Sequence, residues 1–243
     1  MKKTVLWILL LLAAVVLPGR VFAESKQILM VVTSANQIRE GKPTGLWLEE
    51  FAVPYLAFKE AGLEVTVASI KGGEAPIDPR SMEDKIKGRQ WSKVISILKA
   101  TAPLAKVDST KYDAIFLPGG HGAMFDLPAD NNLKGLLDQF AKANKVIAAV
   151  CHGPAGFVGA KKADGSPLVA GLTVTAFTDA EEKALHLDKE MPFLLETRLR
   201  EERANFIAGE KWGAHVEVDG RMVTGQNPAS SEGVAKAVIK LLK

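Results

Sequence analysis

The sequence predicts an α/β fold, in which a mostly parallel central sheet has helices on both faces and forms a three-layer sandwich. Two observations lead to this prediction. Short apolar runs alternate along the chain with longer amphipathic stretches, which is typical of β-α-β units. The apolar runs are nearly continuous, as in strands that are buried on both faces of a parallel sheet. Because ligands bind such sheets at the carboxyl ends of the strands, the loops that follow the strands are where we expect a site.

Residues 1–23 are predicted to be a secretory signal peptide. Two lysines precede an uncharged stretch from Thr4 to Gly19 that is rich in Leu, Val and Ala, and small residues end the segment at Ala23. A retained membrane anchor is the alternative, but the apolar stretch falls short of the roughly 20 residues that a spanning helix needs. We therefore expect export, to the periplasm or outside the cell, with cleavage near Ala23 and no stable membrane insertion afterwards.

Residues 24–243 are predicted to form a single domain without net charge. The formal charge of +3 rests on Lys2, Lys3 and Arg20, because the rest of the chain carries 28 basic and 28 acidic residues. No excess of positive charge remains that would indicate a nucleic-acid partner. The length suffices for one hydrophobic core, and no low-complexity stretch divides it.

The first half of this domain begins with a β-α-β unit. Residues 27–33 and 64–69 are predicted strands, and the segment between them is a predicted helix from about residue 46 to residue 61. Residues 72–91, rich in Gly, Pro and charge, interrupt the alternation. We interpret them as an insertion that shapes the mouth of a site.

The second half continues the alternation of strands and helices. Its predicted elements are central strands at residues 113–117 and 145–150, a helix at 132–143, a strand at 172–177, a mostly helical segment at 181–203, a hairpin of 215–218 with 222–224, and a closing helix at about 230–242.

The single cysteine, Cys151, is the candidate nucleophile. It follows the predicted strand 145–150 directly and precedes His152, Gly153 and Pro154, which is the pattern of a nucleophile elbow. The N-terminus of a helix after such a turn would favour the thiolate form. With one cysteine in the chain, no intramolecular disulfide can form. The alternative is a cysteine that packs as a small hydrophobic side chain.

Two further segments carry candidate site residues. A glycine-rich loop follows the strand 113–117 and contains Gly119, Gly120 and His121; its backbone N–H groups could hold an oxyanion, although such a loop is also an ordinary turn. His121 could act as a base or could be a packed loop histidine. On the helix 46–61, Glu49 and Glu50 point about 100° apart, so one of them is expected to face the site and the other solvent.

Together, these segments resemble the ThiJ/PfpI family, relatives of the class I glutamine amidotransferases, and in particular the branch with glyoxalase III and heat-shock holding chaperones. The resemblance covers nearly all of residues 24–243 and implies the flavodoxin-like fold of class I glutamine amidotransferases. The motifs that carry it are PTGLWLEEFAVPY from residue 43, LPGGHGAMFDLP from 117, AVCHGPAG from 149, TAFTDAEE from 175 and VTGQNPAS from 223.

The resemblance also implies roles for residues. Cys151 matches the nucleophile, His152 its partner in the catalytic pair, and Glu50, four residues before Pro54, the carboxylate that hydrogen-bonds the thiol. Glu182 matches the acidic residue that orients the histidine, while Asp179 and Glu181 remain alternatives for this role. The backbone at Gly120 and His152 would form the oxyanion site, and Gly119, His121 and Gly153 would adjoin the substrate.

The implied activity is that of a cysteine-dependent, glutathione-independent glyoxalase, a lyase of the hydro-lyase class that converts a 2-oxoaldehyde to a 2-hydroxy acid, or of a related deglycase. The partners would be a small 2-oxoaldehyde or a glycated protein, and the resemblance implies a homodimer. No cofactor is expected. The four histidines show no metal-ligand spacing, so no metal site is expected either.

Two other functions stay open. A holding chaperone would need an exposed apolar patch, for which residues 191–195 are the candidate, although an ordinary helix docked on the core is favoured there. A cysteine amidase or peptidase could use the same elbow, but a small, enclosed pocket would argue against it. Because methylglyoxal arises chiefly inside cells, the export signal also leaves open deglycation repair, another small substrate, or oxidative-stress sensing through an exposed thiol of low pKa.

Overall fold

The computed structural model describes residues 25–82 and 91–243. The predicted signal peptide, residues 1–23, and residues 83–90 of the predicted insertion lie outside the described residues. Within the described ranges, no helix combines the length and the apolar composition that crossing a membrane would require.

A seven-stranded sheet forms the middle layer of the fold, in the order β10-β11-β7-β6-β1-β4-β5. All neighbouring strands are parallel except β10, which pairs antiparallel with β11. The predicted mostly parallel sheet and the predicted hairpin are therefore confirmed. The strands are β1 (Gln27–Val32), β4 (Glu64–Ser69), β5 (Ala102–Pro103), β6 (Ala114–Leu117), β7 (Val146–Val150), β10 (Val216–Asp219) and β11 (Met222–Gly225).

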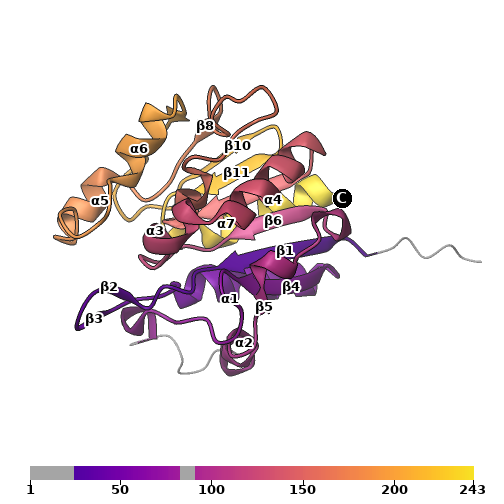
Figure 1. The fold of residues 1–243 in the computed structure, drawn as a ribbon, viewed down its shortest axis with the longest axis horizontal. Coiled ribbons are helices and arrows are strands. Elements are labelled where there is room, and N and C mark those ends of the chain that lie inside the picture. Colours follow the sequence, from indigo (N-terminus) through magenta and orange to yellow (C-terminus); the bar gives the residue numbers. More distant parts are fainter. Residues whose placement is uncertain (1–24, 83–90) are drawn as a thin grey trace, which may run out of the picture.

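Helices cover both faces of this sheet, as predicted. Successive side chains of β1 alternate between two hydrophobic clusters, because side chains in a strand point to opposite faces in turn. One cluster joins the sheet to α1 (Leu48–Glu60), α2 (Trp91–Leu98) and α7 (Ser231–Leu242), and the other joins it to α3 (Ala123–Asp126) and α4 (Asn131–Lys142). In Figure 1, α4 lies in front of the strands and the yellow α7 behind them.

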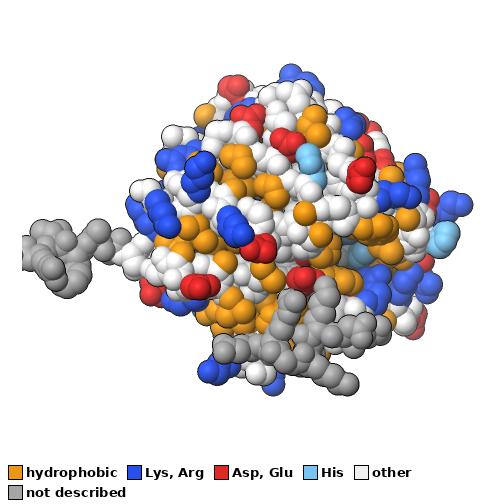
Figure 2. Space-filling view, turned by 180° about the vertical axis from the view of Figure 1, so that it is seen from behind, with side chains coloured by type: hydrophobic (Ala, Val, Ile, Leu, Met, Phe, Trp, Pro, Cys, Tyr) orange, Lys and Arg blue, Asp and Glu red, His pale blue; other side chains and the backbone are white. Residues whose placement is uncertain are grey.

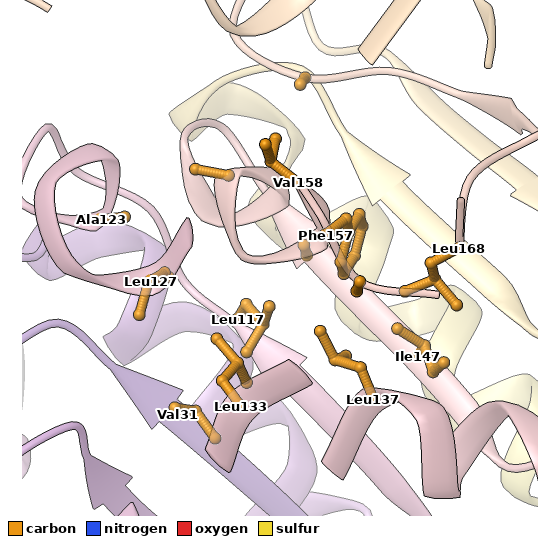
Figure 3. Close-up of a cluster of buried hydrophobic side chains, with 14 of the residues drawn as sticks. Val31, Leu117, Ala123, Leu127, Leu133, Leu137, Ile147, Phe157, Val158 and Leu168 are labelled. Atoms are coloured by element: carbon orange, nitrogen blue, oxygen red, sulfur yellow. The ribbon is translucent and has the colours of Figure 1, made fainter. Parts of the chain in front are cut away.

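The core between α4 and the sheet is tightly packed. Leu133 and Leu137 of α4 point toward Leu117 of β6 and Ile147 of β7, and Phe157 closes the same layer (Figure 3). These five side chains are almost entirely removed from water. Their burial fixes the helix against the strands, and thereby fixes the loops that leave the strand ends.

The carboxyl ends of β1, β6 and β7 lie next to one another, because the three strands are adjacent and parallel. In Figure 1 the arrowhead of β1 points left, toward α3 and toward α5 (Asp179–Ala184). A small two-stranded sheet of β2 (Gln37–Arg39) and β3 (Lys42–Pro43) lies at the same end. The loops that sequence analysis selected therefore meet at one edge of the sheet.

The segment 172–177 departs from the prediction. The structure has a strand only at β8 (Thr173–Val174), and this strand pairs with β9 (Asn205–Phe206) in a separate sheet. The backbone N–H groups beyond it bind other partners: Thr175 donates to the Thr224 hydroxyl, and Phe177 donates to the carbonyl of Cys151. These bonds draw the segment over the site instead of into the central sheet.

The predicted helix at 181–203 was also wrong in extent. Two short helices occupy the segment, α5 (Asp179–Ala184) and α6 (Leu195–Glu201), and the residues that connect them are not α-helical (Figure 1). Helix α5 ends at Ala184 with Leu185 as its C-cap, and His186 then has a φ of 56°, a left-handed conformation that stops a helix. Pro192 follows in the connection, where it cannot continue an α-helical ladder.

The surface has few large hydrophobic side chains in water. Figure 2 shows one face, on which acidic and basic side chains are interspersed and the hydrophobic ones form small groups. Among the described residues, the exposed large hydrophobic side chains are Leu185, Ile207, Trp212 and Val218. Two of them, Leu185 and Trp212, line the cavity that contains Cys151.

Candidate active site

Cys151 lies on a sharp turn directly after β7. Its φ of 59° is left-handed, which is uncommon for a residue other than glycine and is found where the surroundings hold the backbone in place. Two backbone hydrogen bonds do this: Cys151 N–H donates to the carbonyl of Gly225, and its own carbonyl accepts from Phe177 N–H. The turn continues into a 3-10 helix, η5 (Gly153–Phe157), rather than into a long α-helix.

Gly153 serves the packing of this turn. A Cβ atom at Gly153 would lie 2.0 Å from the carbonyl oxygen of Leu117, so only glycine lets η5 approach β6 this closely. Gly153 is not among the residues that line the cavity at Cys151. The structure therefore separates it from the predicted substrate-binding residues and gives it a steric role.

His152 connects the thiol to a carboxylate. Its Nδ1 atom lies 3.2 Å from the Cys151 Sγ, and its Nε2 atom lies 2.7 Å from Oε2 of Glu182. An ionised carboxylate only accepts hydrogen bonds, so the proton of a neutral His152 belongs on Nε2 and Nδ1 is free to accept the thiol proton. Both side chains are buried. Cys151, His152 and Glu182 thus have the arrangement of a Cys-His-Glu triad.

The two alternatives to Glu182 lie elsewhere. Asp179 accepts hydrogen bonds from the backbone and hydroxyl of Thr197 in α6. Glu181 is fully buried, and its carboxylate holds the neighbouring loops together. The donors to Glu181 are the backbone and hydroxyl of Thr178, the backbone N–H of Trp212, and the side-chain amides of Gln226 and Asn227.

Glu50 approaches Cys151 from helix α1. It is fully buried, whereas its neighbour Glu49 is partly exposed, as the spacing of the two residues predicted. Its Oε2 atom accepts a hydrogen bond of 2.9 Å from the backbone N–H of Gly119. Burial raises the pKa of Glu50 to about 8, and hydrogen bonds with the Cys151 thiol and Gly119 only partly oppose this effect. The Glu50 carboxyl is therefore mostly neutral at pH 7.

The thiol itself differs from expectation. Burial raises the pKa of Cys151 well above its ordinary value, the Glu50 carboxyl raises it further, and the backbone N–H of Gly120 acts in the opposite direction. The expected low-pKa, exposed thiolate is therefore wrong for the resting protein, because Cys151 is 4% exposed and is followed by only a short 3-10 helix. A reaction of this thiol as a nucleophile would therefore require transfer of its proton to a neighbouring group.

The glycine-rich loop divides its N–H groups between two acceptors. Gly119 donates to Glu50, so this amide is occupied and is not available for a substrate oxyanion. The amide of Gly120 hydrogen-bonds the Cys151 sulfur. Gly120 has a φ of 97°, and a Cβ atom there would lie 2.4 Å from the backbone nitrogen of Trp47. Gly120 is therefore the glycine of this loop whose N–H group lies at the sulfur, where the sequence predicted a donor for an oxyanion.

His121 is buried beside the triad and contacts it through Glu182. Its Nε2 atom lies 3.0 Å from Oε1 of Glu182, and its Nδ1 atom lies 3.1 Å from Nη2 of Arg80. Arg80, on the 3-10 helix η1 (Pro79–Met82), was not selected from the sequence. The only signal for it was the insertion to which it belongs, since nothing in the local pattern distinguishes it from a surface arginine.

A cavity of about 180 Å³ opens onto Cys151. Its volume suits a small molecule, and most of its wall is hydrophobic. Sequence analysis did not select the aromatic and apolar wall, because these residues come from segments far apart in the chain. The lining residues are Trp47, Glu50, Gly120, His121, Cys151, His152, Phe177, Leu185, Trp212 and Pro228.

Within the described ranges, His121, His152 and Glu182 form a group whose ligand atoms lie within 4.8 Å of one another and could hold a metal ion. Sequence spacing gave no sign of this group, because the three residues lie far apart in the chain. The two Nε2 atoms and the two carboxylate oxygens are already paired with each other. A metal ion would have to replace both hydrogen bonds.

Residues 44–241 match the model of the DJ-1/PfpI family. The glutathione-independent glyoxalase hsp3101 of Schizosaccharomyces pombe is 34% identical over 218 residues, which cover 83% of this chain and 89% of the relative. The protein/nucleic acid deglycase HchA of Pseudomonas aeruginosa is 27% identical over 237 residues, covering 89% and 81%. The crystal structure of glyoxalase III from Candida albicans has a TM-score of 0.81 and 30% identity, covering 88% of this chain and 96% of that one.

The tight approach at Gly153 gives a paired prediction. Gly153→Ala should destabilise the protein by about 1–3 kcal/mol or more, because the new methyl group overlaps the Leu117 carbonyl. Gly135→Ala is the matched control: it lies on the exposed side of α4 with nothing near its Cβ position, and should stabilise by about 0.5–1 kcal/mol. Urea unfolding of both variants measures the difference, and equal midpoints would contradict it.

The raised pKa of Glu50 gives a prediction for stability against pH. A carboxyl whose pKa is about 8 in the folded protein and 4.5 in the unfolded chain keeps its proton only when folded, so stability falls as pH rises between these values. Glu50→Gln cannot ionise and should lessen the fall in unfolding free energy from about pH 6.5 to about pH 8.5. The titration of His121, whose pKa is about 4 in the folded protein and 6.5 in the unfolded chain, contributes equally in the wild type and in the variant and so cancels in the comparison.

Glu49→Gln is the control for this experiment, because it replaces a carboxyl by an amide one residue away and leaves the buried carboxyl in place. It should keep the wild-type fall. An equal loss of unfolding free energy in Glu50→Gln and in the wild type over the window would mean that Glu50 is ionised in the folded protein, contrary to its raised pKa.

Proposed function

The chain belongs to the DJ-1/PfpI family, and from this premise we propose that it is a cysteine-dependent, glutathione-independent glyoxalase. It would convert a small 2-oxoaldehyde to the corresponding 2-hydroxy acid. The observation that carries the proposal is the pair of proton-transfer groups at the thiol: His152 Nδ1 lies 3.2 Å from the sulfur, and Glu50 approaches from α1. Both face a cavity of small-molecule size.

The first step would be addition of the thiol to the aldehyde. The Cys151 proton passes to Nδ1 of His152 while the sulfur bonds to the aldehyde carbon, C1. The aldehyde oxygen takes the proton of the neutral Glu50 carboxyl and becomes a hydroxyl. The product is a hemithioacetal, with a protonated His152 and an ionised Glu50, and Glu182 stabilises the imidazolium.

The second step would move a proton from C1 to C2. The Glu50 carboxylate removes the hydrogen from C1, and the protonated His152 gives its proton to the oxygen on C2, which leaves an enediol. Glu50 then returns the proton to C2, and His152 takes the proton of the C1 hydroxyl. The result is a thioester of the 2-hydroxy acid, formed without any external oxidant. A pKa of about 8 suits Glu50 to this work, because it can gain and lose a proton near neutral pH.

Hydrolysis would complete the cycle. Water attacks the thioester carbon and gives a proton to Glu50, while the sulfur leaves with the proton of His152. The thiol, the neutral His152 and the neutral Glu50 are thereby restored, and the acid is released. Over the whole reaction one water is added to the 2-oxoaldehyde. The same groups could release an acyl group from a glycated side chain, and the similarity to the deglycase HchA supports this related reaction.

The alternatives receive less support. In the segment 191–195 proposed for a chaperone patch, Met191 and Leu195 are buried in the core and Phe193 packs partly against it. An amidase or peptidase would need room for a chain of residues, and the cavity of about 180 Å³ favours a smaller substrate. The described residues thus favour chemistry on a small aldehyde.

Enzyme assays test the proposal. The wild type should consume methylglyoxal and form lactate without glutathione, and Cys151→Ser should lose at least about 1,000-fold in rate. His152→Ala and Glu50→Gln should each lose about 100-fold to 10,000-fold, because each removes a proton-transfer group. Glu49→Gln is the matched control and should keep the wild-type rate. A folded wild type that leaves the aldehyde unchanged would refute the glyoxalase activity, and a glycated peptide would then be tested.

We also propose that the chain is exported with loss of residues 1–23 and that it forms a homodimer. The signal-peptide pattern of residues 1–23 supports the first part, and the family resemblance supports the second. When the full-length chain is expressed in a bacterium, the protein recovered from the periplasm should have the intact mass of residues 24–243 and the light-scattering mass of two chains. A full-length mass in the cytoplasm would refute export, and the mass of one chain would refute the dimer.

A further inference from the structure

The carboxylate of Glu182 is shared by two histidines. Oε2 lies 2.7 Å from Nε2 of His152, and Oε1 lies 3.0 Å from Nε2 of His121. The two rings lie 4.2 Å apart between centroids, and all three side chains are buried. Burial alone would raise the pKa of Glu182, but the two histidines lower it below its usual range. The proposed reaction uses only one of these histidines.

Arg80 determines which nitrogen of His121 carries the proton. A guanidinium group can only donate hydrogen bonds, so Nδ1 of His121, which lies 3.1 Å from Nη2 of Arg80, must be the acceptor. The proton of His121 therefore belongs on Nε2, where it is donated to Glu182. Burial, His152 and Arg80 lower the pKa of His121 to about 4, although Glu182 acts in the opposite direction. His121 is accordingly neutral at pH 7.

Arg80 is itself held in position by a buried carboxylate. Its Nε atom donates to Oδ1 of Asp78 at 2.9 Å, and Nη2 donates to Oδ2. The side chain of Asp78 has no exposed surface, and it also accepts a hydrogen bond of 2.9 Å from the hydroxyl of Thr44. A forked, two-point contact of this kind fixes the plane of the guanidinium, which a lysine could not reproduce.

We propose that Arg80 and His121 are positioning residues, which hold Glu182 so that His152 keeps Nδ1 toward the thiol of Cys151. The chain of contacts runs from Asp78 through Arg80, His121 and Glu182 to His152. Arg80 keeps His121 neutral and in one tautomer, and His121 occupies the second oxygen of Glu182. That carboxylate then has one geometry available for His152. The titratable and charged groups that face His121 are His152, Glu182 and Arg80.

The tautomer of His121 can be measured without any assay of activity. The chain has only four histidines, so their imidazole nitrogens can be resolved by 15N NMR and assigned with His→Gln variants. In the wild type, His121 should be neutral with its proton on Nε2 at pH 7. In Arg80→Leu its pKa should rise from about 4 toward the ordinary 6.5, since a neighbouring positive charge and the donor to Nδ1 are both lost.

Two further variants keep this test decisive. Arg80→Lys replaces Arg80→Leu if the latter fails to fold, because lysine retains a positive charge for Asp78. An ammonium group lacks the fork that joins Asp78 to His121, so the tautomer of His121 should become mixed. Arg221→Gln is the control: among the described residues, the Arg221 side chain hydrogen-bonds only the carbonyl of Leu241, and its removal should change neither the tautomer nor the pKa of His121. A wild-type His121 with its proton on Nδ1, an unchanged His121 pKa in folded Arg80→Leu, or an unmixed His121 tautomer in Arg80→Lys would overturn the proposal.

The effect on catalysis rests on the proposed function and is measured separately. His121→Leu removes the donor to Glu182 and should lower kcat at least about tenfold while KM stays within about threefold. His121→Gln keeps an N–H group that can reach Glu182 and should restore most of kcat. Equal loss in both folded variants would show that donation to Glu182 is not what His121 contributes.

If the wild type turns over no aldehyde, alkylation of Cys151 by iodoacetamide replaces the enzyme assay. The rate reports transfer of the thiol proton, because the thiolate is the reacting form. The dependence of the rate on pH should change in His121→Leu and be restored in His121→Gln. Failure of the glyoxalase activity and failure of the positioning chain thus give different results: the first leaves the NMR and alkylation data as expected, and the second does not.

Discussion

The left-handed backbone of Cys151 is the constraint on which the rest of the site depends. With a φ of 59°, the chain turns away from β7 in a single residue, and the bonds to Gly225 and Phe177 hold it there from both sides. The bond to Phe177 has a further consequence. It brings the segment that leads into α5 across the end of the sheet, which places Glu182 within reach of His152. The strained backbone of Cys151 and the position of Glu182 beside His152 are therefore parts of the same arrangement.

Sequence reasoning identified the strands and the elbow because each has a local signal, whereas the choice of Glu50 over Glu49 came from the family resemblance. A continuous apolar run marks a buried strand, and the two adjacent glutamates of one helix must face different ways. The prediction of a strand at 172–177 was wrong in extent. The composition of this segment suits a strand, but two of its backbone N–H groups donate to the Thr224 hydroxyl and to the Cys151 carbonyl. Arg80 and Trp212 could not be found in this way, because their importance comes from residues more than thirty positions away.

The protonation of the Cys151 thiol differs from what its sequence motif predicts. A cysteine at the start of a long α-helix would be expected to ionise readily, since the helix dipole favours negative charge. Here the turn leads into a five-residue 3-10 helix, and the sulfur is buried beside Glu50. Desolvation and a neighbouring acid outweigh the single amide of Gly120. A protonated thiol beside one proton acceptor, His152, and one proton donor, the neutral Glu50 carboxyl, suits addition to an aldehyde, because the proton that the thiol releases is needed again in the later steps.

Glu50 and Glu182 are both buried but differ in protonation, and a third buried glutamate, Glu181, differs from them in its contacts. Glu50 has a single backbone donor and a thiol beside it, so burial dominates and keeps it neutral. Glu182 accepts from two histidines and stays ionised, which fits it to stabilise a positive charge on His152. Both carboxylate oxygens of Glu181 accept hydrogen bonds, from five donors in the surrounding loops, so neither oxygen is available for a reaction. Environments that separate the pKa values of neighbouring carboxyls are how one site obtains both an acid and an anion at the same pH.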